Sequence, residues 1–412
     1  MPNRRTSGSE GRCRQRRPQQ RMPSRHSGRR EVAVPGTSPR RLEPALDRHH
    51  YVDAASFARE TDVLRREWTC IGRLDDIGLG AAAGVMPERR AVVSYFGESV
   101  IVTADDAGSL HALANVCRHR GSQVVPVEPG VPVAPCVAKS LRCPYHSWTY
   151  GLDGRLLHAP HTDDVDLDAS AFALRPLRAA AWGGFLWVTE NPEADAVVDA
   201  LAPVPNRVRR YPLERLVVGL RLSYSVAANW KVIAENYNEC YHCGPVHPEL
   251  SRLIPAFGGG GTDLEWEDGI PHREGAWTFT VSGTTDRSPF PDLNEAERVR
   301  HKGELVYPNL LLSLAADHVA AFVLRATAVD RTEIVCDLLF APDEAAKPGF
   351  DPSDAGDLWD LVNRQDWAIC ESVQRGMASR YYTRGWFAPM EDASADIRRW
   401  LLPRLEGRGA DV

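Results

Sequence analysis

The chain lacks any apolar run long enough to cross a membrane. Its 412 residues contain no stretch that approaches the roughly 20 consecutive apolar residues of a transmembrane helix. The start also lacks the apolar core of a secretory signal peptide. Charged residues make up 25% of the chain and the formal net charge is −6, which is typical of a globular protein. We therefore expect a cytoplasmic protein without a membrane partner, long enough for two domains.

Cysteine is scarce, and its count of nine is odd. The chain is also much longer than secreted domains that depend on disulfides. We infer that the protein resides in a reducing compartment, where disulfides are rare, so clustered cysteine and histidine residues indicate metal binding. Cys136 is expected to be a bystander. The cysteines expected to be small buried apolar residues are Cys70, Cys240, Cys243, Cys336 and Cys370.

Acidic side chains are almost absent from the first forty residues, which are rich in arginine, serine, proline and glutamine. Large apolar residues are too few there to nucleate a core, so residues 1–48 are expected to form a disordered tail. A nucleic-acid-binding arm and an organelle transit peptide are the alternatives. The rest of the chain is more acidic than the total, which argues against a nucleic-acid partner for the folded body.

Two kinds of pattern divide the remaining chain into domains. Short strand-like runs, among them 91–96, 99–103 and 185–189, fill residues 70–188 and predict a small all-β domain. An amphipathic helix is predicted before it, at 54–68, and a linker bounded by prolines after it, at 191–205.

The second half predicts an α+β domain. Helical patterns occur at 229–243 and 357–381. The strand-like runs are 216–226, 276–282, 310–314, 320–329 and 333–340. Strands with a few long helices predict an antiparallel sheet. We place the two domains at residues 49–205 and 206–412.

Two loops each pair one cysteine with one histidine: Cys117-x-His119 and Cys143-x-x-His146. Two thiolates and two imidazoles can bind a tetrahedral zinc ion. They can also hold a [2Fe–2S] cluster in which two histidines replace two cysteines on one iron. Zinc fingers usually pair cysteine with cysteine and histidine with histidine. The mixed loops therefore favour the cluster.

A second group of metal-ligating residues follows Asn229. On a continuous helix, Glu235, Glu239 and His242 share one face, and His247 follows the helix end expected at Gly244-Pro245. A solvated acidic face is the alternative reading. The neighbouring residues are largely apolar, however, and buried carboxylates are costly unless they are paired or coordinated. We therefore predict a metal site at this helix.

A third ligand is expected on the predicted helix 357–381. Asp366 lies within a stripe of apolar residues at helical spacing. The stripe consists of Trp359, Val362, Ile369, Val373 and Met377. Two histidines and one carboxylate form the facial triad of non-haem Fe(II) oxygenases. His242, His247 and Asp366 are the predicted triad.

Four segments together resemble a known family. They read CRHRG, CPYHSWTY, ENYNECYHCGPVHPEL and NRQDWAICESVQRG, and they resemble the alpha subunits of Rieske non-haem iron oxygenases of the ring-hydroxylating superfamily. The resemblance covers the chain from about Tyr51 onward. It implies an all-β Rieske [2Fe–2S] domain and a catalytic domain with a helix-grip fold, in which a long helix lies against an antiparallel sheet. The segment 122–142 between the cluster loops is longer than the family pattern.

The resemblance also implies roles for single residues. Cys117 and Cys143 would bind the buried iron of the cluster, and His119 and His146 the outer iron. The proposed triad would bind a mononuclear Fe(II). In the family an acidic residue three positions before the first triad histidine links the two metal centres. Here it is Glu239, and it would contact His146 of the partner subunit in a homotrimer.

The implied activity is that of a terminal oxygenase. It would take electrons from a separate NAD(P)H-dependent reductase and use O₂ to oxidise a small substrate. The sequence around Glu239 resembles that of the choline, glycine betaine and carnitine branch, whose members hydroxylate or N-demethylate quaternary ammonium compounds. An aromatic box would suit such a cation. Its candidates are Trp277, Phe279, Tyr307 and Phe322, although aromatic residues on strands are commonly ordinary core.

Two other functions remain open at this point. One is an aromatic-ring-hydroxylating dioxygenase alpha subunit that forms cis-dihydrodiols on the same fold. The other is a zinc-containing structural or nucleic-acid-binding protein that uses the arginine-rich tail.

Overall fold

The computed structural model describes residues 41–81, 84–85, 89–128, 133–261 and 264–407. The expectation of disorder for 1–40 lies outside the described residues. For residues 41–48 the expectation is wrong, because β1 (Glu43–Asp47) pairs antiparallel with β20 (Arg384–Phe387). Among the helices of the described segments, none is long and apolar enough to span a membrane.

A seven-stranded antiparallel sheet forms the predicted all-β domain. In sheet order its strands are β2 (Thr69–Arg73), β13 (Phe185–Thr189), β12 (Pro176–Trp182), β7 (Leu110–Ala114), β6 (Glu98–Ala104), β5 (Arg89–Tyr95) and β8 (Cys136–Val137). The three strands named from the sequence are confirmed. Ala91, Val93 and Tyr95 alternate as buried residues along β5, as the period of a strand requires.

A smaller three-stranded sheet carries the second Cys–His loop. Its order is β11 (Leu156–His158), β10 (Thr149–Tyr150) and β9 (Leu141–Arg142). The chain turns between β10 and β11 at Asp153-Gly154, where Gly154 has φ +85° and a Cβ would lie 2.6 Å from Leu113 Cδ2. Only glycine suits that position. A separate hairpin pairs β3 (Gly80–Ala81) with β4 (Gly84–Val85).

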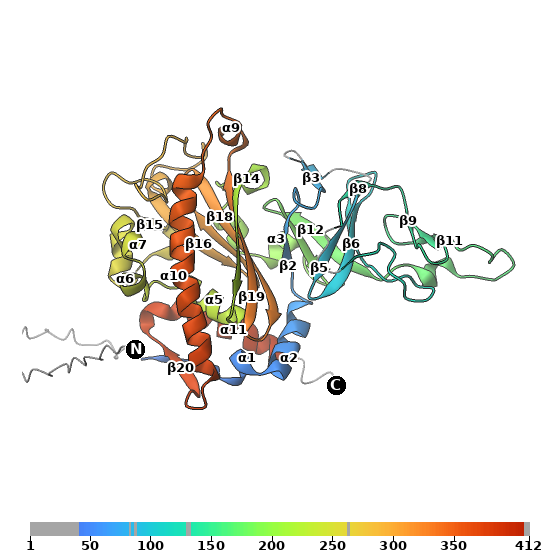
Figure 1. Cartoon of the computed structure of the whole chain (residues 1–412), viewed down its shortest axis with the longest axis horizontal. Helices are drawn as coiled ribbons and strands as arrows, with labels where there is room; N and C mark the ends of the chain where they lie inside the picture. Colours follow the sequence, from blue (N-terminus) through green and yellow to red (C-terminus); the bar gives the residue numbers. More distant parts are fainter. Residues whose placement is uncertain (1–40, 82–83, 86–88, 129–132, 262–263, 408–412) are drawn as a thin grey trace, which may run out of the picture. The chain divides into compact units, whose positions relative to one another are not determined.

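A six-stranded antiparallel sheet forms the core of the second domain. Its order is β14 (Val217–Val226), β19 (Arg331–Phe340), β18 (His318–Ala328), β17 (Leu310–Leu314), β16 (Arg300–Val306) and β15 (Ile270–Pro271). Leu311 and Phe322 belong to the core on one face of the sheet, and Leu310 and Val323 to the core on the other. The long helix α10 (Ser353–Ala378) runs along the first face (Figure 1). The predicted α+β architecture with a helix against an antiparallel sheet is confirmed.

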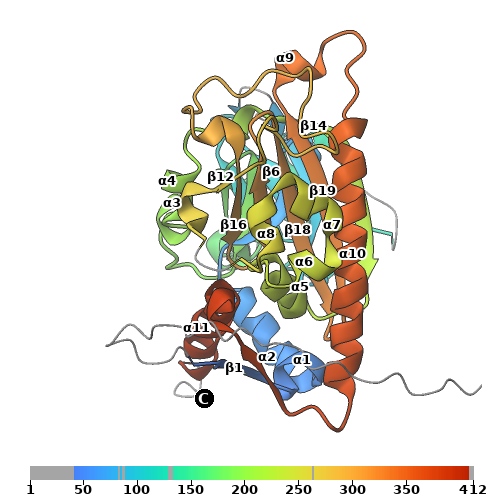
Figure 2. The same cartoon turned by 90° about the vertical axis from the view of Figure 1, so that its left-hand side faces the viewer.

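Short helices complete this face of the sheet (Figure 2). They are α5 (Trp230–Tyr237), α6 (Cys243–Val246), α7 (Pro248–Leu253) and α8 (Pro255–Gly258). The prediction of one continuous helix over 229–243 is wrong, because α5 ends at Tyr237 and α6 begins at Cys243. Asn229 does cap α5, since its side chain accepts a hydrogen bond from the backbone N–H of Lys231.

Two further details differ from the prediction. Residues 276–282, all described, form bends rather than a strand. The cause is local: the Thr280 hydroxyl donates to the Thr284 carbonyl and accepts from Gly283 N–H, so side chains replace strand pairing. On α10, Ile369 and Val373 are 38% and 39% exposed and lie outside the buried stripe.

The N-terminal helices contact the second domain. They are α1 (His49–Val52) and α2 (Ala54–Leu64). The helix α2 ends at Leu64, four residues before the predicted end at residue 68. They pack on α10 and on α11 (Asp392–Glu406), and Lys231 Nζ lies 2.6 Å from Glu60 Oε2 in a fully buried ion pair. The segment expected to begin the Rieske domain therefore packs on elements of 206–412. The linker region holds α3 (Val197–Ala200) and α4 (Val204–Arg207), and α9 (Pro342–Ala345) follows β19.

Candidate metal centres

Three side chains from distant parts of the chain converge beside the six-stranded sheet. His242, His247 and Asp366 each offer a ligand atom, and these atoms lie within 4.8 Å of one another. His247 Nε2 is 3.2 Å from His242 Nε2 and 2.9 Å from Asp366 Oδ1. His242 Nε2 is 3.2 Å from the same oxygen. The geometry therefore brings the three predicted triad residues to one point.

Local structure explains how each of these side chains is placed. His242 lies in the turn between α5 and α6, and His247 lies between α6 and α7, where Pro248 begins α7. Asp366 lies in the middle of α10, one turn from the buried residues Val362 and Cys370 on either side. The break after Tyr237 is functional, because it lets the chain turn both imidazoles toward α10.

Hydrogen bonds on the far side of each imidazole fix its orientation. His242 Nδ1 lies 2.5 Å from Glu239 Oε1, and His247 Nδ1 lies 2.7 Å from Gln365 Oε1. Both acceptors place the proton on Nδ1, which leaves Nε2 free to bind a metal. Glu239 also accepts from the backbone N–H groups of Tyr241 and His242. Glu239 thus shapes the turn and orients one ligand.

The charges of the three residues support each other. Burial lowers the pKa of His242, but the hydrogen bonds that His242 donates to Asp366 and Glu239 outweigh burial and raise the pKa to about 10. Burial likewise raises the pKa of Asp366, and its hydrogen bonds to His242 and His247 outweigh this and lower it. The site thus stabilises positive charge between carboxylates. A divalent metal such as Fe(II) would displace the proton from Nε2 of His242, and two neutral imidazoles with one carboxylate suit such a metal.

Glu235 does not belong to this site. The sequence placed it on one helical face with Glu239, but α5 ends between the two. Glu235 is buried and accepts a hydrogen bond of 2.6 Å from the Tyr51 hydroxyl. It therefore faces the N-terminal helices and not the metal.

The cysteines around His242 also differ from expectation. Cys240 and Cys243 are buried, as predicted, but they form a disulfide. The turn between α5 and α6 brings their Cα atoms to 4.9 Å, within the range that a disulfide needs. Both cysteines line the cavity that adjoins the three residues. Gly260 and Gly261, at φ +79° and +72°, pack on the same turn.

A cavity of about 90 Å³ opens beside the three converging residues. Its floor comes from β16, β17 and β18, and its walls from α10 and the turns around α5 to α8. The lining includes Tyr237, Glu239, Leu250, Phe257, Trp266, Phe279, His301, Leu311, Ser313, Phe322, Trp359, Val362, Asn363, Asp366 and Trp367. It contains no lysine or arginine among the residues that the structure describes.

Two of the four predicted aromatic residues line this cavity. Phe279 and Phe322 do so, whereas Tyr307 stacks on Trp400 at 4.8 Å and Trp277 packs on the opposite face of the sheet. The sequence missed Trp359, whose ring stacks on Phe279 at 4.2 Å. The sequence could have indicated Trp359, because it lies in the same apolar stripe as Asp366, and residues one or two turns from a ligand share its side of the helix.

The two Cys–His loops meet at the end of the three-stranded sheet. Cys117 and Cys143 are 3% and 1% exposed, whereas His119 and His146 are exposed and their rings lie 4.6 Å apart. Gly121 at φ +75° turns the first loop. The thiols therefore face the core and the imidazoles face outward.

Neighbouring aromatic residues support these loops. The buried ring of Trp148 stacks on His119 at 5.0 Å. The Tyr150 hydroxyl lies 3.2 Å from Cys117 Sγ and accepts from Arg118 N–H. In the described segments, only the group of His242, His247 and Asp366 has three ligand atoms within 4.8 Å.

Comparisons with known proteins identify both regions. Residues 68–171 match the family described as "Rieske [2Fe-2S] domain", and residues 213–407 match "Ring hydroxylating alpha subunit (catalytic domain)". The chain is 30% identical to the glycine betaine monooxygenase oxygenase subunit of Chromohalobacter salexigens, over 90% of this chain and 89% of that protein. It is 28% identical to the carnitine monooxygenase oxygenase subunit of Escherichia coli strain K12, over 84% and 87%.

A solved structure shows the same fold. The crystal structure of the quaternary ammonium Rieske monooxygenase CntA aligns with a TM-score of 0.66 at 22% identity, over 88% of this chain and 96% of that one. These matches exclude the alternative of a zinc-containing structural protein, and they imply a Rieske cluster and a mononuclear iron as cofactors. The chain belongs to the Rieske non-haem iron oxygenases, as an oxygenase subunit with a Rieske domain and a ring-hydroxylating catalytic domain.

Proposed function

We propose that this enzyme hydroxylates or oxidatively N-demethylates a small quaternary ammonium compound, using O₂ and electrons from a separate NAD(P)H-dependent reductase. The observation that carries the proposal is the cavity of about 90 Å³, which is walled by aromatic rings and adjoins His242, His247 and Asp366. The relatives named for glycine betaine and carnitine support the same substrate class.

The charge of the cavity does not oppose a cation. Glu239 and Asp366 line it, and no lysine or arginine does so in the described part of the chain. The rings of Phe279, Phe322 and Trp359 provide faces for cation–π attraction. A metal at the triad would offset the two carboxylates, so a cationic substrate would meet little repulsion. The small volume also favours a compact substrate over the fused rings of an aromatic-ring dioxygenase.

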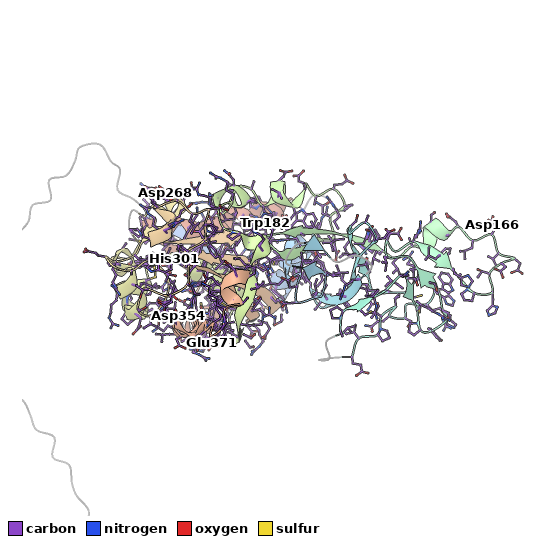
Figure 3. All side chains as sticks on the ribbon, turned by 90° about the horizontal axis from the view of Figure 1, so that it is seen from above. Asp166, Trp182, Asp268, His301, Asp354 and Glu371 are labelled. Carbon is purple, nitrogen blue, oxygen red and sulfur yellow. A yellow bond between two sulfur atoms is a disulfide. The ribbon has the colours of Figure 1, made fainter. Side chains whose placement is uncertain are left out.

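The metal ligands that we propose are those that the geometry groups. Cys117, Cys143, His119 and His146 would hold the cluster, and the triad would hold Fe(II). When bound, the cluster supplies single electrons and the mononuclear iron activates O₂ for C–H oxidation. Figure 3 shows all described side chains of the protein.

The residues around the triad have three tasks. Glu239 and Gln365 hold the Nδ1–H groups of the two histidines, which keeps both Nε2 atoms directed at the metal position. Leu250 and Val362 add apolar surface to the cavity. The aromatic rings orient a methyl group of the substrate toward the triad.

We propose that electrons enter each catalytic site from the cluster of the partner subunit in a homotrimer. Two observations support this. The cluster loops and the triad pack in separate hydrophobic cores, and the cluster imidazoles are exposed at the surface. Glu239 would then connect His242 to His146 of the partner subunit. In this arrangement the Rieske domain would comprise residues 49–205 and the catalytic domain residues 206–412. We place the enzyme in the cytoplasm.

The test is an assay of the purified oxygenase with a surrogate reductase. Glycine betaine, choline, carnitine and stachydrine are supplied in turn, and formaldehyde and oxidised products are measured. A matched control is 3,3-dimethylbutanoate, in which a neutral tert-butyl group replaces the trimethylammonium group of glycine betaine. We expect product from at least one quaternary substrate and none from the control. A cis-dihydrodiol from an aromatic hydrocarbon, with no product from the quaternary compounds, would contradict the proposal.

A further inference from the structure

His301 is a buried histidine that none of the metal sites uses. It lies on β16, is 8% exposed and lines the cavity beside the triad. Its ring lies 4.8 Å from Phe279 and 6.1 Å from Trp359, both of which line the same cavity. Figure 3 labels His301 within the catalytic region. The imidazole of His301 thus lies beside the aromatic rings that we propose bind the ammonium group of the substrate.

The hydrogen-bonding capacity of His301 is unused. Neither ring nitrogen has a hydrogen-bond partner among the described residues, and Nδ1 is fully buried. Buried polar atoms without partners are rare because each costs free energy. An unpaired acceptor is tolerated better than an unpaired N–H, so the proton belongs on Nε2 and the lone pair on the buried Nδ1. His301 therefore presents one N–H donor whose partner the protein does not supply.

Several other polar groups of the cavity are already paired. The Tyr237 hydroxyl and Ser313 Oγ lie 2.8 Å apart. Asn363 donates to the Tyr224 hydroxyl at 3.2 Å, and Trp359 Nε1 donates to His318 Nε2 at 3.1 Å. Trp367 Nε1 also lacks a partner, but it lies on α10 beside Asp366, next to the triad. His301 is the unpaired donor that lies on the sheet.

The charge of His301 suits a ligand that carries both signs. Burial, together with the neighbouring His272 and His318, lowers the pKa of His301 to about 3, so the ring is neutral. A neutral imidazole does not repel a nearby trimethylammonium group. A zwitterion brings its own positive charge, so its carboxylate needs a hydrogen-bond donor and not a lysine or arginine.

We propose that His301 binds the carboxylate of a betaine-type substrate through Nε2–H, while the trimethylammonium group lies against Phe279, Phe322 and Trp359. This inference rests on the proposed function and narrows it to carboxylate-bearing quaternary ammonium compounds. His301 is a specificity-determining residue in this assignment, because choline has a hydroxyl in place of the carboxylate and tetramethylammonium has neither.

The test measures ligand binding to the anaerobic holoenzyme by isothermal titration calorimetry. The ligands are glycine betaine, choline and tetramethylammonium, and the variants are His301→Leu and His301→Gln. Loss of a hydrogen bond to a charged group typically weakens binding by roughly ten- to a hundredfold. We expect that loss for glycine betaine in His301→Leu, with a change of less than about threefold for tetramethylammonium, for which no such bond exists. His301→Gln retains an N–H and should recover part of the affinity.

Comparing ligands within one variant separates binding from folding. A general defect in His301→Leu would weaken glycine betaine and tetramethylammonium equally, and equal weakening or no weakening overturns the inference. An equal loss for choline and glycine betaine overturns the assignment to a carboxylate. His272→Leu serves as the matched control, because His272 is a buried histidine that does not line the cavity. If wild-type protein binds none of the three ligands, the proposed function fails as well.

Discussion

His247 Nε2 lies 2.9 Å from Asp366 Oδ1, although the two residues are 119 positions apart in the chain. The contact joins the turn after α6 to the middle of α10. It places a carboxylate against two imidazoles, and it therefore defines where a metal would bind.

Replacing Asp366 should remove the mononuclear iron and spare the cluster. Asp366→Ala leaves two imidazoles without a carboxylate, so we expect iron at this site to be lost. Replacing a residue that only supports a metal ligand typically lowers activity by roughly 10- to 100-fold, and the loss in Asp366→Ala should be larger. The visible absorption of the cluster should persist. Iron and acid-labile sulfide measured together check this. Asp360→Asn is the control, because Asp360 lies on the same helix but accepts a hydrogen bond from the Tyr224 hydroxyl. Full iron content in Asp366→Ala would contradict the assignment.

Glu239→Gln should leave both metals bound but nearly abolish coupled turnover. The amide oxygen can still accept from His242 Nδ1–H, so the imidazole keeps its orientation while the negative charge is lost. We expect a loss of roughly 100-fold in product formed. Product per NADH consumed, together with metal content, is the measurement. Glu265→Gln, an exposed change near the cavity, is the control. Normal turnover in Glu239→Gln would exclude a linking role for this carboxylate.

The residues that we propose as cluster ligands and as the triad stand out in the sequence because each motif is nearly continuous. Cys117 and His119 share one loop, and His242 and His247 flank one short helix. Asp366 was found through periodicity, which works on a helix as regular as α10.

The cavity and the helix break could not be predicted in this way. The helical periodicity of 229–237 can be extended through residue 243, whereas the break is stabilised by Glu239, whose carboxylate accepts hydrogen bonds from the backbone N–H groups of Tyr241 and His242. Such local side-chain bonds compete with a continuous helix, and periodicity alone does not reveal them. His301 and Trp359 meet at the cavity from a strand and a helix distant in sequence. Pairing of that kind depends on packing, which a local pattern does not contain. Cys240 and Cys243 were not expected to form a disulfide because the sequence predicted a reducing compartment and a continuous helix over 229–243.

Tyr150→Phe should lower the reduction potential of the cluster. The Tyr150 hydroxyl lies 3.2 Å from Cys117 Sγ, and a hydrogen bond to a ligand sulfur stabilises the reduced, more negative state. Redox titration followed by visible absorption measures the effect. Tyr95→Phe is the matched control, since its buried hydroxyl donates to the Arg65 carbonyl in the same domain. An unchanged potential in Tyr150→Phe would show that the hydroxyl does not contact the ligand sulfur.

Glu235 should make the stability of the protein fall as pH rises. Burial raises its pKa to about 8 from an ordinary value of 4.5, despite the hydrogen bond from Tyr51. Between these two values the unfolded chain loses the proton before the folded protein does, so the unfolded state binds fewer protons. The free energy of unfolding then falls with pH, by up to about 1.4 kcal/mol per pH unit for one group, and levels off above about pH 8.

Glu235→Gln removes this titration and keeps an oxygen that accepts from the Tyr51 hydroxyl. We expect its urea midpoint to exceed that of the wild type at pH 8.5 by more than at pH 5.5, because only the wild type must bury a group that ionises across this window. Glu333→Gln, at a partly exposed position on β19, should follow the wild type at both values. If Glu235→Gln and the wild type lost stability in parallel over this range, the carboxyl would already be ionised in the fold, and the buried contact with Tyr51 would have to hold a charge.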